Sequence, residues 1–420
     1  MCPVSPAKRC MMGVTKTFRL NSDAPLLHVL TMIVALLAAF APLQVWIPAI
    51  CVAAVILLRR LIARDMRGLH HPHFVFVILA VVAWGALTSL WSIDPERSLE
   101  KSAKLLLFAG SLIILFDAAM KLTQEERKTF AGWLTLSALI FVILTLGKFA
   151  KIEIVTYWIN QQTVLGNEFD SLNRTASILA IFVWPSALVI FQIYGRRAAI
   201  GFVGLSALTV FLLPPFAPLL ALVIGAGVFA SALYSQKLGI ALLFMGFAAF
   251  IAMVLLLNTL VPWANEILLA NIDTPNSEVH RFVIWQFAAD RIIEQPLFGW
   301  GLDSSRVFPG GSQELFLFNN PDGSAATGAA MPLHPHNSII QIWLELGLVG
   351  IGLIATLVGL AWRGMTHARS GKAGAAAVMA TVASGFVVAQ LGFGVWQGWW
   401  LATLGIAAIY VLAVIPKSDR

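Results

Sequence analysis

Long apolar runs separated by polar connections dominate the pattern of this chain. A membrane-spanning helix needs about 20 mostly apolar residues, and twelve runs come near or reach that length. These runs cover residues 26–40, 45–58, 74–90, 103–120, 129–146, 175–194, 198–213, 216–233, 238–260, 338–362, 373–391 and 395–414. The pattern predicts an all-α polytopic membrane protein with about twelve transmembrane helices, forming a single transmembrane domain over residues 1–420.

One connection is much longer than the others. Residues 261–337 join the ninth and tenth predicted spans, whereas connections usually have about 4 to 6 residues and long ones are usually functional. Within this loop, residues 277–294 predict a helix that Asn276 or Ser277 caps and that Pro296 ends. Turn-forming residues then dominate 299–311 and 319–328. We therefore expect functional residues in or beside this loop.

Composition and charge agree with a membrane location. The 420 residues are 59% hydrophobic and only 12% charged, which lies outside the range of soluble domains. The net charge of +7 does not indicate a nucleic-acid partner, because no dense basic stripe is interleaved with aromatic residues. With the N-terminus inside, 19 of the 28 basic residues fall on the inner side and 9 on the outer side. The sequence thus predicts cytoplasmic termini and a periplasmic 261–337 loop.

The densest group of polar residues lies at the start of the tenth span. In the segment 333–350, Asn337 and Ser338 are typical of a helix N-cap, so His336 would stand immediately before a helix. The free backbone N–H groups and positive potential of a helix N-terminus suit a phosphate. In the alternative interpretation, His334 and His336 are interfacial residues without a chemical role.

Two arginines are predicted on the same side of the membrane as these histidines. Arg174 begins the sixth span, and Arg281 lies in the loop helix. Each could simply extend toward the membrane surface, but together they suit a diphosphate, which guanidinium groups bind in forked geometry. Their positive field would also lower the pKa of His336 and keep it neutral, as a general base requires.

Two other residues are auxiliary candidates for the site. Trp285 lies four residues after Arg281, so it either stacks on the guanidinium or packs in a core. Glu345 lies inside the tenth span, where a carboxylate is costly unless it faces a cavity or partners an arginine.

The acidic residues do not predict a metal site. Asp94 and Glu96 flank Pro95, a pattern typical of the first turn of a helix. No His, Cys or Asp cluster has metal-ligand spacing. We therefore expect a reaction that needs neither a metal nor another cofactor.

Three stretches together resemble the bacterial O-antigen ligase and polymerase superfamily. These are RTA from Arg174, RFVIWQFAADRIIEQPLFGWGLDS from Arg281, and HPHNSIIQIWLELGLVGIGL from His334. The resemblance implies that His336 is the catalytic base and that Arg174 and Arg281 bind the diphosphate of an undecaprenyl-diphosphate-linked glycan. His334 competes with His336 for the role of base; we favour His336 because it directly precedes Asn337.

The resemblance also implies the reaction and its setting. A ligase of this kind sits in the bacterial inner membrane and transfers the glycan to a sugar of lipid A-core at the periplasmic face, with inversion and without metal. An O-antigen polymerase or a protein O-oligosaccharyltransferase shares these motifs. A transporter of lipid-linked sugars is the alternative from another class. The sequence disfavours a transporter for two reasons. No internal repeat is visible, and the arginines and histidines singled out above lie at the outer mouth of the bundle rather than inside the spans.

Overall fold

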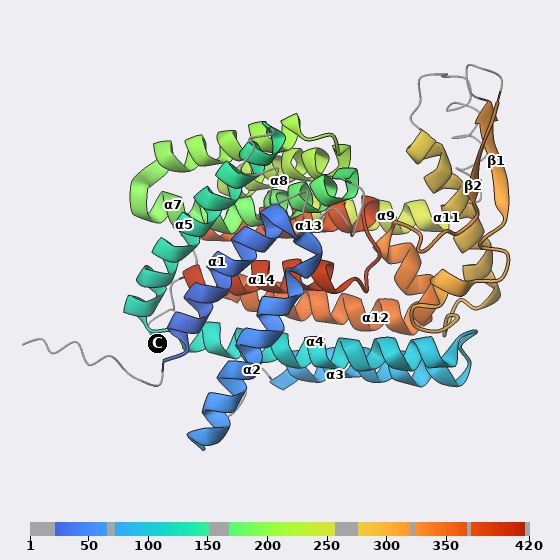
Figure 1. The fold of residues 1–420 in the computed structure, drawn as a ribbon, viewed down its shortest axis with the longest axis horizontal. Coiled ribbons are helices and arrows are strands. Elements are labelled where there is room, and N and C mark those ends of the chain that lie inside the picture. Colours follow the sequence, from blue (N-terminus) through green and yellow to red (C-terminus); the bar gives the residue numbers. More distant parts are fainter. Residues whose placement is uncertain are drawn as a thin grey trace, which may run out of the picture.

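A computed structural model describes residues 22–64, 72–150, 168–256, 276–319, 324–367 and 371–415. Helices make up almost all of the fold (Figure 1). They are α1 (Ala24–Phe40), α2 (Trp46–Ile62), α3 (Pro72–Leu87), α4 (Pro95–Lys121), α5 (Gln124–Phe149), α7 (Glu168–Leu212), α8 (Phe216–Tyr234), α9 (Gln236–Leu255), α11 (Asn276–Glu294), α12 (Ser338–His367), α13 (Gly371–Leu391) and α14 (Gly398–Val414). Two antiparallel strands, β1 (Glu314–Asn319) and β2 (Ala325–Ala329), form a hairpin.

The predicted membrane architecture is confirmed. In the described residues, nine helices are long and apolar enough to span a membrane. One of them, α7, is interrupted at Gly195, whose φ of 82° and ψ of −178° are not helical. Val183 and Phe202 lie on either side of Gly195 yet line the same small cavity, so the two halves of α7 fold back on each other. With the shorter apolar helices α1 and α14, the count reaches the predicted twelve.

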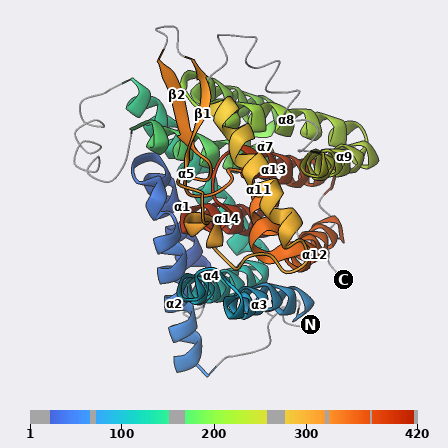
Figure 2. The ribbon, with the colours of Figure 1, turned by 90° about the vertical axis from the view of Figure 1, so that its right-hand side faces the viewer.

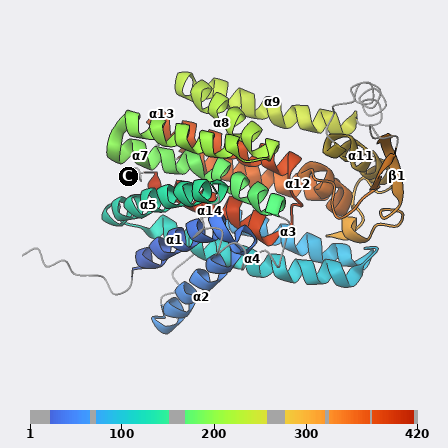
Figure 3. The same cartoon turned by 45° about the horizontal axis from the view of Figure 1, so that its top comes forward.

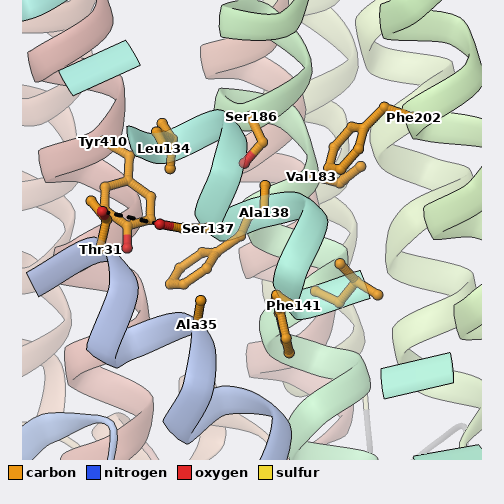
Figure 4. A pocket seen from close by; sticks show the side chains of 12 residues that line it. Thr31, Ala35, Leu134, Ser137, Ala138, Phe141, Val183, Ser186, Phe202 and Tyr410 are labelled. Atoms are coloured by element: carbon orange, nitrogen blue, oxygen red, sulfur yellow. Dashed lines mark hydrogen bonds between the residues drawn. The ribbon is translucent and has the colours of Figure 1, made fainter. Parts of the chain in front are cut away.

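The cavity between α1, α5, α7 and α14 is too small to be a substrate site (Figure 4). It offers about 20 Å³ to the centre of a water molecule, which is room for roughly one water. Its lining is mostly apolar, and the hydroxyl of Ser186 is buried there without a hydrogen-bond partner in the described residues. One buried water would satisfy that hydroxyl, whereas a sugar or lipid chain would not fit.

Helix caps occur where the sequence places capping residues. The side chain of Asp94 accepts the N–H of Arg97 at 3.0 Å, and Pro95 occupies the first turn of α4. The prediction that Asp94 is a helix cap is thus confirmed. Thr123 and Glu126 form a reciprocal capping box at the start of α5.

The helix α11 and the β-hairpin cover one end of the helical bundle, which we call the loop end (Figures 1 and 2). The predicted loop helix is confirmed, whereas the hairpin was not predicted: β1 lies mostly between the two turn-rich stretches, and β2 lies mostly in the second of them, where we expected a loop. The last four residues of the predicted ninth span, 257–260, and residues 261–275 and 320–323 of the predicted loop lie outside the described residues. The apolar core sits deeper in the bundle, among α1, α4, α5, α7 and α14 (Figure 3).

The helix α12 is broken at Gly347, in contrast to the continuous tenth span that we predicted. Gly347 has φ 67° and ψ −168°, and a Cβ there would lie 2.2 Å from the carbonyl oxygen of Leu297. The segment 296–301 crosses the break and bonds to both halves of the helix. Trp300 N–H donates to Leu344 at 2.9 Å, and Leu348 N–H donates to Pro296 at 3.0 Å. The backbone groups that the break exposes are therefore satisfied by this crossing segment.

Candidate functional site

The two histidines stand side by side immediately before α12. Their ring centroids are 4.3 Å apart, and His336 has a left-handed φ of 54°. The side chain of Asn337 caps α12 by accepting the N–H of Ile340 at 3.1 Å, which confirms the predicted helix start. The cap fixes the helix start, and the unusual backbone turn at His336 sets the direction of its ring.

The hydrogen bonds of His336 define its free nitrogen. Nδ1 lies 2.8 Å from the carbonyl oxygen of Gly392, in the turn between α13 and α14. A carbonyl only accepts, so Nδ1 carries the proton and Nε2 presents a lone pair. This is the tautomer that a general base needs.

The surroundings of His334 differ from those of His336. His334 is 4% exposed, and each of its ring nitrogens lies 3.3 Å from another nitrogen, Nδ1 from the backbone N–H of His336 and Nε2 from the side-chain amide of Gln397; a neutral imidazole accepts at only one of these two positions. The amide oxygen of Gln397 accepts from Trp399, which orients the amide nitrogen toward His334. Burial first, then the charges of His336 and Arg306, lower the pKa of His334 to about 3. His334 is therefore a poor proton acceptor.

The pKa of His336 is also lowered. Burial is the main cause, and the charges of Arg281 and His280 act in the same direction. The hydrogen bond to Gly392 and the charge of Asp170 oppose them. These effects place Arg281, on α11, within electrostatic reach of His336 and keep the imidazole neutral near pH 7.

Arg174 is linked to the region around His336 by Asp170, which lies one turn earlier on α7. The two side chains form an ion pair at 3.6 Å, and the charge of Asp170 acts on His336. Arg174 is 17% exposed at its side chain, and its Nε is buried with no hydrogen-bond partner in the described residues. An unpaired buried donor is costly, so this nitrogen is suited to an acceptor that arrives with a ligand.

Trp285 packs in an apolar core, which is one of the two roles that we considered for it. It is 5% exposed, lies in an apolar cluster with Ile340 and Leu344, and donates from Nε1 to the carbonyl oxygen of Pro335 at 2.8 Å. Pro335 lies between the two histidines, so Trp285 links α11 to the segment that carries them.

Glu345 does not partner an arginine, which was one of the two arrangements that we considered for it. Its side chain is fully buried, and its carboxylate accepts hydrogen bonds from neutral donors rather than from an arginine. The donors are Asp303 N–H, Ser305 Oγ, Gln341 Nε2 and Trp396 Nε1.

Sequence reasoning missed the role of Asp303. This carboxylate is 3% exposed and attracts three cations, with Lys101 Nζ at 3.3 Å, Arg306 Nε at 3.3 Å and Arg97 at 3.9 Å. Lys101 and Arg97 come from the first turns of α4, far away in sequence. The only signal in the sequence was that all three cations are among the nine basic residues predicted to lie on the outer side of the membrane.

Among the described residues, no three His, Cys, Asp or Glu side chains group in a way that could hold a metal ion.

The fold and the site together define a polytopic membrane protein with a neutral histidine and two arginines at one end of its bundle. Residues 181–355 match the family model described as O-antigen ligase. That stretch contains Arg281, His334 and His336, whereas Arg174 lies just before it. The resemblance to O-antigen ligases indicated by the sequence motifs is thus confirmed.

Individual relatives point the same way. A protein of Rickettsia conorii, named as a candidate polysaccharide ligase, is 33% identical over 146 residues, which are 35% of this chain and 34% of that protein. A Rickettsia bellii protein named in the same way is 26% identical over 349 residues, which are 81% of this chain and 80% of that protein. The chain thus matches about a third of the length of the first relative. No solved structure matches the chain.

Proposed function

We propose that this protein is a ligase that transfers O-antigen glycan from undecaprenyl diphosphate to a sugar of lipid A-core. The reaction would take place at the periplasmic face of the bacterial inner membrane, with both termini in the cytoplasm. The observation that carries the proposal is the geometry of His336, whose Nδ1 proton points to Gly392 and whose Nε2 is available near Arg281. The family match over 181–355 supports the glycan-transfer class.

The proposed reaction is an inverting displacement. Nε2 of His336 takes the proton of an acceptor hydroxyl, and the hydroxyl oxygen attacks the anomeric carbon. The bond between that carbon and the diphosphate oxygen breaks, and the electron pair leaves with the lipid diphosphate. Arg174 and Arg281 stabilise the charge that develops on the leaving group.

The low pKa of His336 suits this role in two ways. The ring is neutral and ready to accept a proton near pH 7, and its imidazolium form releases that proton readily after transfer. The buried Nε of Arg174 supplies a donor for one diphosphate oxygen.

The test is reconstitution of purified protein with an undecaprenyl-diphosphate glycan and a lipid A-core acceptor in the presence of EDTA. Wild type is expected to form the conjugate. Longer glycan chains without conjugate would indicate a polymerase, and glycan on an added protein acceptor would indicate a protein O-oligosaccharyltransferase. Movement of the lipid-linked glycan across the membrane without any transfer would indicate a transporter and would overturn the proposal.

A further inference from the structure

The carboxylate of Glu345 joins two segments that are far apart in the sequence. Oε2 accepts the N–H of Asp303 at 2.6 Å and Nε1 of Trp396 at 2.5 Å. Oε1 accepts Oγ of Ser305 at 2.7 Å and Nε2 of Gln341 at 3.0 Å. All four partners donate, which matches a side chain with two oxygen acceptors. A carboxylate is thus better suited to this position than any neutral side chain.

One of these connections leads to the turn that holds both histidines. Gln341 uses its amide nitrogen for Glu345 and its amide oxygen to accept the N–H of Val395 at 2.8 Å. With Trp396, this fixes the turn 392–397 at two consecutive residues. The same turn supplies the carbonyl of Gly392 to His336 and the side chain of Gln397 to His334.

The turn is also packed closely against the histidines. A Cβ on Gly394 would lie 2.8 Å from Cδ2 of His334, so the backbone at this position has no room to shift toward the ring. On the other side of Glu345, Ser305 also lies 3.4 Å from the carbonyl oxygen of Leu333, next to His334. Both connections from Glu345 therefore end at the segment 333–336.

We propose that Glu345 is a positioning residue for the transfer reaction, which it supports by fixing the turn 392–397 that orients the ring of His336. This inference rests on the proposed function. Glu345 does not touch substrate, because it is fully buried beneath the histidines' supporting turn. Its effect passes through Gln341 and Val395 on one path and through Trp396 on the other.

Substitution with glutamine separates this role from simple packing, because Glu345→Gln keeps the side-chain volume. Asp303 N–H and Trp396 Nε1 cannot become acceptors, so the new amide nitrogen must occupy the position of Oε1. There it faces Ser305, whose hydroxyl can rotate, and Gln341, whose amide must flip to accept. The flip turns the NH₂ of Gln341 toward Val395 N–H and removes the bond that holds the turn.

The double variant Gln341→Glu with Glu345→Gln provides the matched control. One oxygen of the new carboxylate accepts from the amide at 345, and the other accepts from Val395 N–H. Charge, volume and hydrogen-bond count are then restored with the two groups exchanged. The single variant Gln341→Glu places two carboxylates in contact, so we expect it to be the least stable of the series.

The first measurement is transfer by folded protein, as kcat and KM for each substrate. Glu345→Gln is expected to lower kcat by roughly 10²-fold with little change in either KM, since a misplaced base loses rate rather than binding. The double variant is expected to recover to within about threefold of wild type. If the double variant is as slow as the single one, or if Glu345→Gln matches wild type, the inference is overturned.

The second measurement does not depend on activity. Diethyl pyrocarbonate modifies neutral imidazole, so the pH dependence of His336 labelling, followed by peptide mass spectrometry, reports its pKa. The charged and titratable groups that face His336 are Arg281 and His280 from α11, Asp170 from α7, and His334 beside it. None of these is altered in the variants.

The hydrogen bond to Gly392 raises the pKa of His336, so loosening the turn must lower it. We expect the labelling midpoint to move to lower pH in Glu345→Gln and to return in the double variant. An unchanged labelling midpoint in Glu345→Gln would overturn the positioning role, whatever the rate of glycan transfer by this variant. A shifted midpoint in a protein that transfers no glycan would instead leave the positioning geometry supported and count against the proposed function.

Discussion

Arg60 and Arg174 lie at opposite ends of the helical bundle and differ in how completely their side chains are paired. At the end away from the loop, Arg60 pairs with Asp117 at 2.6 Å and with Asp23 at 2.8 Å, and Lys121 also pairs with Asp117. At the loop end, the Nε of Arg174 has no partner in the described residues, and Nε2 of His336 presents a lone pair. Charges that satisfy one another stabilise a fold, whereas donors and acceptors left open at a mouth are suited to a ligand.

Arg127 illustrates the structural use of a buried cation. It is 6% exposed and donates to five backbone carbonyls, those of Leu122, Ala119, Leu412, Ala413 and Ile415. These carbonyls lie at the C-terminal ends of α4 and α14, where helices leave acceptors unpaired and favour positive charge. Arg127 thus joins two helix ends, and all three of its guanidinium nitrogens donate to backbone carbonyls.

The largest expected effect comes from His336→Ala. Loss of a general base typically costs about 10² to 10⁴ in rate, so we expect kcat for conjugate formation to fall by that factor while donor binding persists. The paired variant His334→Gln keeps a polar side chain beside Gln397 and should lose much less. Equal losses in both variants would contradict the assignment of the base to His336.

Arg174→Lys and Arg281→Lys should have the next largest effect. Each keeps the positive charge but loses the forked donor geometry, so we expect a fall in kcat/KM for the lipid-linked donor of roughly 10²-fold. The KM for the acceptor should not change. Arg291→Lys serves as the control: the Nε of Arg291 is also buried without a hydrogen-bond partner in the described residues, but Arg291 pairs with Glu294 and lies over the ring of Phe287, whereas the charges that act on His336 are those of Arg281, His280 and Asp170. Equal losses at Arg291 would show that the effect is one of folding.

The pH dependence of transfer should show a smaller effect. Transfer requires neutral His336, whose pKa is lowered from 6.5 by burial and by Arg281. The rate is therefore expected to be flat near pH 7 and to fall only as the pH drops through a midpoint below 6.5. Arg281→Gln removes one lowering charge, so its midpoint should lie higher than that of wild type. A rate that already declines above pH 7 on acidification would contradict this assignment.

Arg127→Met should leave the chemistry unchanged. Removing the guanidinium leaves several carbonyls without donors, and we expect a loss of about 3 kcal/mol in stability, measured by thermal unfolding in detergent. The kcat of the folded fraction should match wild type within about twofold. A large loss of kcat in fully folded Arg127→Met would contradict the assignment of a purely structural role to Arg127.

Much of the fold could be predicted from the sequence because the hydropathy of neighbouring residues is enough to indicate a membrane-spanning helix. The spans, the loop helix and the Asn337 cap all depend on residues close together in the chain. The break in α12 could not be predicted, since it depends on the left-handed backbone of Gly347 and on the crossing of residues 296–301. The hairpin was missed because its strands are short and the residues of β2 belong mostly to a stretch rich in turn-forming residues.

The residues of the candidate site could be proposed from the sequence, but the contacts that hold them in place could not be predicted. Periodicity and capping indicate His336, and the motif resemblance indicates Arg174 and Arg281. The acceptor of the His336 proton lies 56 residues further along the chain, and no local pattern indicates such a contact. The partners of Glu345 could not be predicted for the same reason, since they come from three separate segments.

Chemical rescue tests the central claim most directly. His336→Ala removes the imidazole, and free imidazole added to the reconstituted variant can take its place beside Gly392. We predict that imidazole restores conjugate formation in His336→Ala in a concentration-dependent way and does not restore it in Arg174→Lys. If imidazole restores nothing in His336→Ala while the variant remains folded and binds the donor, His336 does not act as the base.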